Sequence, residues 1–338
     1  MIRELKHQIK IQYLVLLILM FIALIFFIRS GFVVSEADID KDYNFIVIID
    51  KYDSIEELQK LYNNNKMLLE DATNNIPGMS VGGDIGLLEK KDVLYRYLLK
   101  NQLPYDSCVL MTRGNNLNTQ FSFLGFVNDP YCVFIYVICM LVGSFAFAKD
   151  FNLGTAKLVY TIGQSRTKIV LKKYLVGLII VTAIASIGFS IFSIIGSYLS
   201  KNGVQYALAI VDGQAYGFNY FQCYLLYLSN ILIFTVMTYS VIYFISVLIC
   251  NTNGSLVCAI LIFIVFNFVF LRLFSKDALG WSNGMLNMLI YGPISWLTDT
   301  TFYGEITVKC WQYIFYPIIV VAFSIASIRI FIKREIKK

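Results

Sequence analysis

The stretch IVLKKYLVGLIIVTAIASIGFSIFSIIGSYL, residues 169–199, decides the fold class. After Lys173 it holds no Asp, Glu, Lys or Arg as far as residue 199. The hydrocarbon core of a bilayer is about 30 Å thick, and an α-helix crosses it with about 20 mostly apolar residues. This stretch is long enough and apolar enough, so it predicts a membrane-spanning helix.

The composition of the whole chain indicates the same environment. Of its 338 residues, 58% are hydrophobic and 15% are charged, whereas about a quarter of the residues of a soluble domain are charged. The run at 11–28 is too long for a signal peptide, and no small-residue cleavage site follows it. We therefore predict an all-α polytopic membrane protein with six transmembrane helices, at residues 11–28, 126–147, 169–199, 221–249, 256–274 and 311–332.

The basic residues predict the orientation of these spans. Lysines and arginines near span ends favour the cytoplasmic side. Half of the 28 lysines and arginines fall on one side of the six-span arrangement, where the acids are Glu4, Asp150 and Glu335. We therefore expect both termini, and the loop between the second and third spans, to be cytoplasmic. The basic residues on this side are Arg3, Lys6, Lys10, Lys149, Lys157, Arg166, Lys168, Lys172, Lys173, Arg329, Lys333, Arg334, Lys337 and Lys338.

The long polar segment at 29–125 is predicted to be a small α/β extracellular domain between the first and second spans. The run NFIVIID at 44–50 is typical of a strand. Ser54 and Glu57 have the spacing of a capping box, which starts a helix, and a second helix is expected at about 87–99. The domain would either cover the outer mouth of the spans or bind a ligand.

The predicted organisation divides the chain into three parts. Residues 1–28 would hold an N-terminal interfacial helix and the first span, and residues 29–125 the extracellular domain. Residues 126–338 would hold the other five spans, with a cytoplasmic loop at 148–168, a short outer loop at 200–220 and a longer one at 275–310.

The stretch DFNLGTAKLVYTIGQSRTKIVLKK, residues 150–173, resembles the first cytoplasmic loop of ABC-2 permeases. In that family an acid precedes Gly-Thr by four residues, an apolar run follows, and a Pro-x-Ser-Arg turn comes seven residues before a Lys. Two positions depart from the pattern: Asp150 replaces the usual Glu, and Gly163 replaces the usual Pro, although Gly also breaks a helix. The matching residues are Asp150, Gly154, Thr155, Leu158, Val159, Ser165, Arg166 and Lys173.

The resemblance implies a transmembrane permease subunit of a bacterial ABC exporter, multi-pass in the plasma membrane. A coupling helix from Asp150 to about Tyr160 would press into a groove of the ATPase, Ser165 would cap the next span, and Arg166 would hold Asp150 or pair with the ATPase. The residues expected to couple to the ATPase are Asp150, Gly154, Thr155, Lys157, Arg166 and Lys173.

The resemblance also implies partners. The chain has no GxxxxGK[ST] motif, so it is not expected to be an enzyme. ATP and Mg would be bound by a separate ABC ATPase, present in two copies. A second permease, identical or homologous, would complete the transporter. Membrane lipid is expected around the spans, and no nucleic acid is expected as a partner.

A substrate cavity is predicted from the aromatic character of the spans and from polar groups within them. Asn267 would lie near the midplane, where a polar side chain either contacts cargo or bonds to a neighbouring helix. Phe134 and Phe263 would line the same cavity. Such a lining favours an amphipathic or hydrophobic cargo: a peptide, an antimicrobial, a drug or a lipid-like molecule.

Several alternatives remain open from the sequence. The chain could be a non-transporting sensor or immunity subunit that recognises an extracellular peptide. The second permease could make a homodimer or a heterodimer. A disulfide could join two of Cys108, Cys223 and Cys310, although spacing alone does not show proximity. The single histidine, His7, excludes histidine-based catalysis or metal binding as a main theme.

Overall fold

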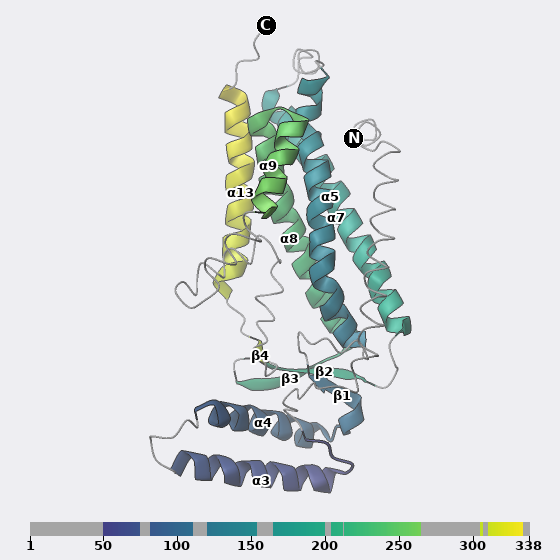
Figure 1. Ribbon diagram of the computed structural model, residues 1–338, viewed down its shortest axis with the longest axis vertical. Helices are drawn as coiled ribbons and strands as arrows, with labels where there is room; N and C mark the ends of the chain where they lie inside the picture. Colours follow the sequence, from purple (N-terminus) through teal and green to yellow (C-terminus); the bar gives the residue numbers. More distant parts are fainter. Residues whose placement is uncertain are drawn as a thin grey trace.

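Long helices form a bundle that stands on a smaller layer of two helices and a sheet (Figure 1). The structure is a computed structural model, and it describes residues 50–74, 82–110, 120–153, 165–199, 204–211, 213–264, 305–306 and 310–333. The bundle contains α5 (Gln120–Asn152), α7 (Arg166–Leu199), α8 (Tyr220–Ile249), α9 (Thr252–Ile264) and α13 (Cys310–Lys333).

Three helices of the bundle are long and apolar enough to cross a membrane. The spanning segments are Tyr131–Asn152 in α5, Arg166–Tyr198 in α7 and Tyr220–Ile249 in α8. Helix α13 covers the predicted span at 311–332, and α9 covers the first part of the span at 256–274. The predicted span at 11–28 and the rest of the fifth lie outside the described residues, so the six-span count stays a prediction.

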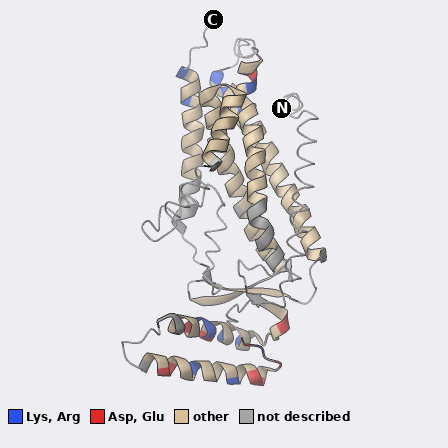
Figure 2. Cartoon of the chain, viewed as in Figure 1, with Lys and Arg blue, Asp and Glu red and all other residues tan. Residues whose placement is uncertain are grey.

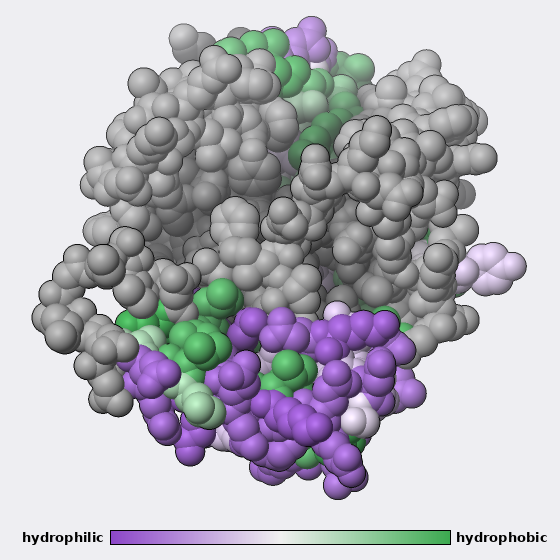
Figure 3. Space-filling view, turned by 60° about the horizontal axis from the view of Figure 1, so that its bottom comes forward, coloured by the Kyte–Doolittle hydropathy of each residue, from purple (hydrophilic) through white to green (hydrophobic). Residues whose placement is uncertain are grey.

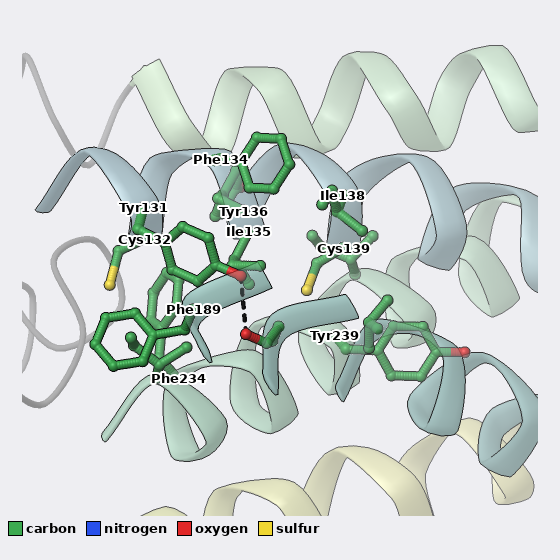
Figure 4. Close-up of a cluster of buried hydrophobic side chains, with 14 of the residues drawn as sticks. Tyr131, Cys132, Phe134, Ile135, Tyr136, Ile138, Cys139, Phe189, Phe234 and Tyr239 are labelled. Carbon is green, nitrogen blue, oxygen red and sulfur yellow. Dashed lines mark hydrogen bonds between the residues drawn. The ribbon is translucent and has the colours of Figure 1, made fainter. Parts of the chain in front are cut away.

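Tyrosine hydroxyls tie the bundle together across its interior. Helix α5 packs against α7, α8 and α9. The Tyr131 hydroxyl donates to the Ala185 carbonyl at 2.8 Å, and the Tyr136 hydroxyl donates to the Ala259 carbonyl at 2.9 Å. Figure 4 shows Tyr131 beside Phe189, within a core of aromatic side chains. A buried polar group without a partner is costly in an apolar medium, so these bonds let tyrosine fill the core.

Glycine allows two of the helices to approach closely. A Cβ atom at Gly177 of α7 would overlap the hydroxyl of Tyr239 on α8. Tyr239 is fully buried, and its ring packs against the ring of Tyr174 with centroids 5.6 Å apart. The absent side chain at Gly177 therefore makes room for the large ring of the neighbouring helix.

The smaller layer contains a four-stranded sheet assembled from distant parts of the chain. Strand β2 (Tyr206–Val211) pairs in parallel with β1 (Cys108–Leu110) and with β4 (Glu305–Ile306), and antiparallel with β3 (Gln214–Phe218). The sequence predicts a connecting loop at 200–220, but the structure has a β-hairpin there. The dipeptide Asp212-Gly213 between two strand-like runs is a strong hairpin signal, and Gly213 adopts a φ of +74°.

Two antiparallel helices cover the sheet on the side away from the bundle (Figure 1). They are α3 (Ile55–Asn74) and α4 (Gly82–Asn101), and both match the predicted helices. Leu58 of α3 and Leu94 of α4 are fully buried in a core that includes Leu208 and Ile210 of β2. The hairpin between α7 and α8 is therefore part of the same folded unit as the polar segment.

One of the two bonds of the predicted capping box at the start of α3 forms as expected, and the other is shifted by one residue. The Glu57 amide donates to Ser54 Oγ at 3.2 Å, as expected. The Glu57 carboxylate, however, accepts from the Asp53 amide at 2.8 Å. The strand predicted at 44–50 lies outside the described residues except for Asp50.

The surface of this layer that faces away from the bundle is mostly hydrophilic, with some hydrophobic side chains among the hydrophilic ones (Figure 3). Inside it, Tyr95 donates a hydrogen bond of 2.6 Å to the Asp50 carboxylate. The pKa of Tyr95 is raised mainly because the side chain is buried, and secondly because of its hydrogen bond to Asp50.

Cys108 and Cys223 are free thiols, so the disulfide left open by the sequence does not join these two.

Candidate functional site

Charged side chains gather at the end of the bundle opposite the sheet. Figure 2 shows Lys and Arg at this end of the helices. Among the residues drawn in colour, the middle parts of the helices carry almost no charged side chains. Helix α5 ends here at Asn152, α7 begins at Arg166, and α13 ends at Lys333. The stretch that resembles the ABC-2 loop therefore starts and finishes at one end of the bundle.

A buried ion pair joins α5 to α7 at this end. The Lys173 ammonium group bonds to the Asp150 carboxylate, and the two side chains are only 6% and 15% exposed. The ammonium nitrogen also lies 5.8 Å from the centre of the Phe147 ring. Removing one partner from such a pair leaves an uncompensated buried charge. The pair therefore fixes the last turn of α5 against the second turn of α7.

Arg166 has a contact within the bundle, and its expected pairing with the ATPase stays a prediction. Lys173 is the cation placed on Asp150, and Arg166 instead lies near the end of α13. The guanidinium Nη1 of Arg166 donates to the carbonyl of Ile332 at 3.4 Å. Carbonyls in the last turn of a helix lack intrahelical partners, so Arg166 links the start of α7 to the end of α13.

Further polar contacts hold α8 and α9 into the same end. The Asn152 side chain of α5 donates to the Thr252 hydroxyl of α9. The Ser246 hydroxyl of α8 donates to the Ser144 carbonyl at 3.0 Å and accepts from the Ala148 amide at 3.2 Å. Helix α5 thus has polar bonds to three neighbouring helices close to the point where the loop leaves it.

The two ends of the loop have different local structures. Ser165 caps α7 as predicted, because its hydroxyl accepts from the Lys168 amide at 3.4 Å. Asp150 does not start a separate short helix, since α5 continues through it to Asn152 and turns at Leu153. The predicted helix start at Asp150 was wrong, because Asp150 lies within α5, where the rings of Phe147 and Phe151 pack one turn apart.

The central part of the loop is not described. Gly154, Thr155 and Lys157 lie within residues 154–164, which are outside the described ranges. Their role at an ATPase surface therefore stays a prediction.

The predicted cavity residues are only partly placed. Phe134 is 4% exposed and packs against Tyr131, with ring centroids 5.7 Å apart, so it lies in the core of the bundle (Figure 4). Asn267 lies outside the described residues. Phe263 falls in α9, although its side chain is not described. The cavity role of all three residues stays a prediction.

Several contributors to this site were missed from the sequence. Thr252 and Ser246 looked like ordinary turn and span residues, and no local pattern pairs them with α5. Lys173 was included for its spacing from Arg166, but not as the partner of Asp150. A charged residue of each sign within or beside apolar spans is a signal for such a pair.

Apolar helices long enough to span a membrane, two of them joined by an ion pair at the charged end of the bundle, define a polytopic membrane protein. The chain matches the family described as ABC-2 family transporter protein over residues 2–300, and it therefore belongs to that family. No curated protein and no solved structure matches it. The chain is thus a membrane component of an ABC transporter, and the resemblance drawn from residues 150–173 is confirmed.

Proposed function

We propose that the chain is the transmembrane permease subunit of an ATP-driven exporter, which moves an amphipathic or hydrophobic cargo out of the cytoplasm or the membrane. The observation that carries the proposal is the ion pair between Asp150 of α5 and Lys173 of α7 in an ABC-2 family member. Helix α5 ends at Asn152 and α7 begins at Arg166, so the segment between them connects two helices that are bonded to each other through Asp150 and Lys173. A force applied to this loop would act on α5 and α7 together.

The proposed mechanism transmits motion of an ATPase to the spans. An ABC ATPase, in two copies, binds ATP and Mg and contacts the loop at Gly154, Thr155 and Lys157. Because α5 also packs against α8 and α9, a shift of its end tilts several spans at once. A second permease, identical or homologous, would form the other wall of the cargo path.

The cargo follows from the character of the spans. Their described surfaces are apolar, and polar side chains such as Thr235 and Ser240 bond to carbonyls of their own helix. An apolar wall lowers the free energy of an amphipathic molecule more than that of an ion or a sugar. Asn267 would supply a polar contact near the midplane.

A second candidate function is favoured by the hairpin between α7 and α8. This hairpin is part of the sheet beneath α3 and α4, so a peptide bound there would act directly on two spans. In this alternative the chain is a sensor or immunity subunit and moves no cargo. Transport by the reconstituted complex separates the two candidates.

Hydrolysis of ATP is expected only when the chain is combined with its ATPase. The purified chain in liposomes should hydrolyse no ATP above the empty-liposome level, because it lacks a nucleotide-binding motif. Adding a partner ABC ATPase should give hydrolysis and ATP-dependent movement of cargo. Stoichiometric hydrolysis by the chain alone would contradict the proposal, and hydrolysis without transport would favour the sensor.

The proposed orientation places both termini in the cytoplasm of a bacterium and the sheet outside. Single cysteines at Asn64 on α3 and at Leu153 after α5, in a cysteine-free background, report on the two ends. Asn64 and Leu153 are both exposed. Whether the reagent reaches each position therefore depends on the side of the membrane on which the residue lies. An impermeant maleimide should label position 64 in intact cells and position 153 only after lysis. The reverse pattern would overturn the orientation.

A further inference from the structure

A serine of α8 reaches the backbone of α5 near the charged end of the bundle. The Ser246 hydroxyl donates to the Ser144 carbonyl at 3.0 Å and accepts from the Ala148 amide at 3.2 Å. Ser144 and Ala148 are four residues apart in α5, and in a regular α-helix such a carbonyl and amide bond to each other. The hydroxyl therefore contacts both members of one backbone hydrogen bond of α5, and a side chain inserted at such a place is a known cause of helix bending.

The residue before this turn also favours a bend. Gly143 and Ser144 form a Gly-Ser pair, which is another common cause of kinks in helices. A Cβ atom at Gly143 would lie 2.8 Å from Cγ2 of Ile242 on α8. Ile242 and Ser246 are four residues apart, so they lie on the same side of α8. The absent side chain at Gly143 therefore lets α8 come close enough for Ser246 to reach α5.

The bridge from Ser246 can open without leaving its backbone groups unpaired. Ser144, Ala148 and Ser246 are fully buried, so each polar group needs a partner within the protein. Without the bridge, the Ser144 carbonyl and the Ala148 amide can bond to each other. The Ser246 hydroxyl can then bond to the carbonyl of Ile242 in its own helix. Thr235 of α8 makes such a bond at 2.6 Å to the carbonyl four residues before it. The bridged and the open arrangements thus have nearly equal hydrogen bonding.

The turn from Ser144 to Ala148 separates two parts of α5 that have different partners. Before it, the Tyr136 hydroxyl bonds to α9 within the bundle. After it, Asp150 bonds to Lys173 of α7, and α5 ends two residues later. A change at this turn would therefore move the end of α5, together with the start of α7, relative to the rest of the bundle.

We propose that the Ser144–Ala148 turn is a joint in α5, and that Ser246 is the positioning residue that holds it in the bridged arrangement. In the open arrangement α5 completes its own hydrogen bond, Ser246 bonds within α8, and the end of α5 moves away from α8. The use of this joint in transport rests on the proposed function, in which an ATPase moves the end of α5. The joint itself does not depend on that function.

Distances between spin labels on the full chain in detergent test the joint. A label at Leu153, after the joint, or at Val133, before it, is paired with a label at Ile325 on α13 in a cysteine-free background, and all three positions are exposed. Ser246→Ala removes the bridging hydroxyl. Leu153 lies about 7.5 Å along the helix beyond Ala148, and a change of about 20° in the helix axis would displace it by about 3 Å. We expect a change of this size in the distance from Leu153, and no change in the distance from Val133.

The matched control is Thr235→Val, which removes a buried hydroxyl of α8 that bonds to its own helix. It should leave both distances unchanged, and Ser246→Ala should melt no lower than this control because its backbone groups bond to each other. Gly143→Ala should repeat the effect of Ser246→Ala, because its added methyl group would push Ile242 and α8 away.

Four results would overturn the joint. They are an unchanged distance from Leu153 in Ser246→Ala or in Gly143→Ala, an equal change in the distances from Leu153 and Val133, the same change in Thr235→Val, and a melting temperature of Ser246→Ala well below that of the control. Every measurement is made without an ATPase, so these results leave the proposed function to its own test.

Discussion

Replacing Lys173 with methionine should destabilise the chain by about 3 kcal/mol, because the Asp150 carboxylate would be left buried without its cation. The two side chains are 6% and 15% exposed, so water replaces the lost partner poorly. The same change should stop transport, since the last turn of α5 would no longer be fixed to α7. Thermal unfolding in detergent, with transport by the reconstituted complex, measures the two effects.

A double-mutant cycle separates the pair from general damage. Asp150→Asn combined with Lys173→Met removes both charges, and we expect it to be more stable than Lys173→Met alone. Arg166→Met is the matched control, because Arg166 is exposed and its bond to Ile332 is long at 3.4 Å. Its effect on stability should be well under 1 kcal/mol, as for other exposed charges. Wild-type stability of Lys173→Met would show that the ion pair does not hold the helices.

Replacing Gly154 with tryptophan should abolish transport while leaving expression and membrane insertion near normal. Gly154 lacks a side chain, so a partner surface can approach its backbone closely, and a large ring there would prevent that approach. Gly154 follows the end of α5 at Asn152 in the sequence, and the family resemblance assigns it to the cytoplasmic loop, so we expect folding to be little affected. Western blotting of membranes and transport assays give the two readings.

Gly154→Ala is the control for this change, because it adds one methyl group and alters the backbone preference in the same direction. We expect Gly154→Ala to keep most of the transport. Full transport by Gly154→Trp would mean that the loop is only a charged connector.

Much of the bundle could be predicted from sequence because hydropathy is a local signal. Helices α7 and α8 begin within a few residues of the predicted spans at 169–199 and 221–249. Helix α5 begins earlier than predicted, at Gln120, and runs through Asp129 and Pro130. A proline breaks the helical hydrogen-bond pattern over only one turn. Pro130 therefore does not mark the start of α5, and composition alone could not place that start.

The sheet could not be predicted because its strands come from three separate segments. Cys108 pairs with Tyr206, and Ile210 pairs with Glu305. A strand of two or three residues has no sequence pattern of its own, and its pairing depends on where the helices place it. Only the hairpin has a local signal, Asp212-Gly213, in a short segment between two predicted spans.

The partner of Asp150 also depends on three-dimensional arrangement. Arg166 and Lys173 are two turns apart on α7, and each offered a cation near the loop. The rotation of α7 turns Lys173 into the interface with α5, and that rotation follows from packing of neighbours such as Tyr174 and Gly177 against α8. The sequence motif identified the residues, but their contacts required the packed bundle.

The central claim is that residues 154–164 contact an ABC ATPase and transmit its motion. A cysteine at Thr155, paired with cysteines in the groove of the co-purified ATPase, tests it most directly. We predict an oxidation-dependent cross-link between the two subunits, and loss of ATP-driven transport when it forms. A complex that transports cargo normally, with no cross-link from position 155 to any groove position, would contradict the account.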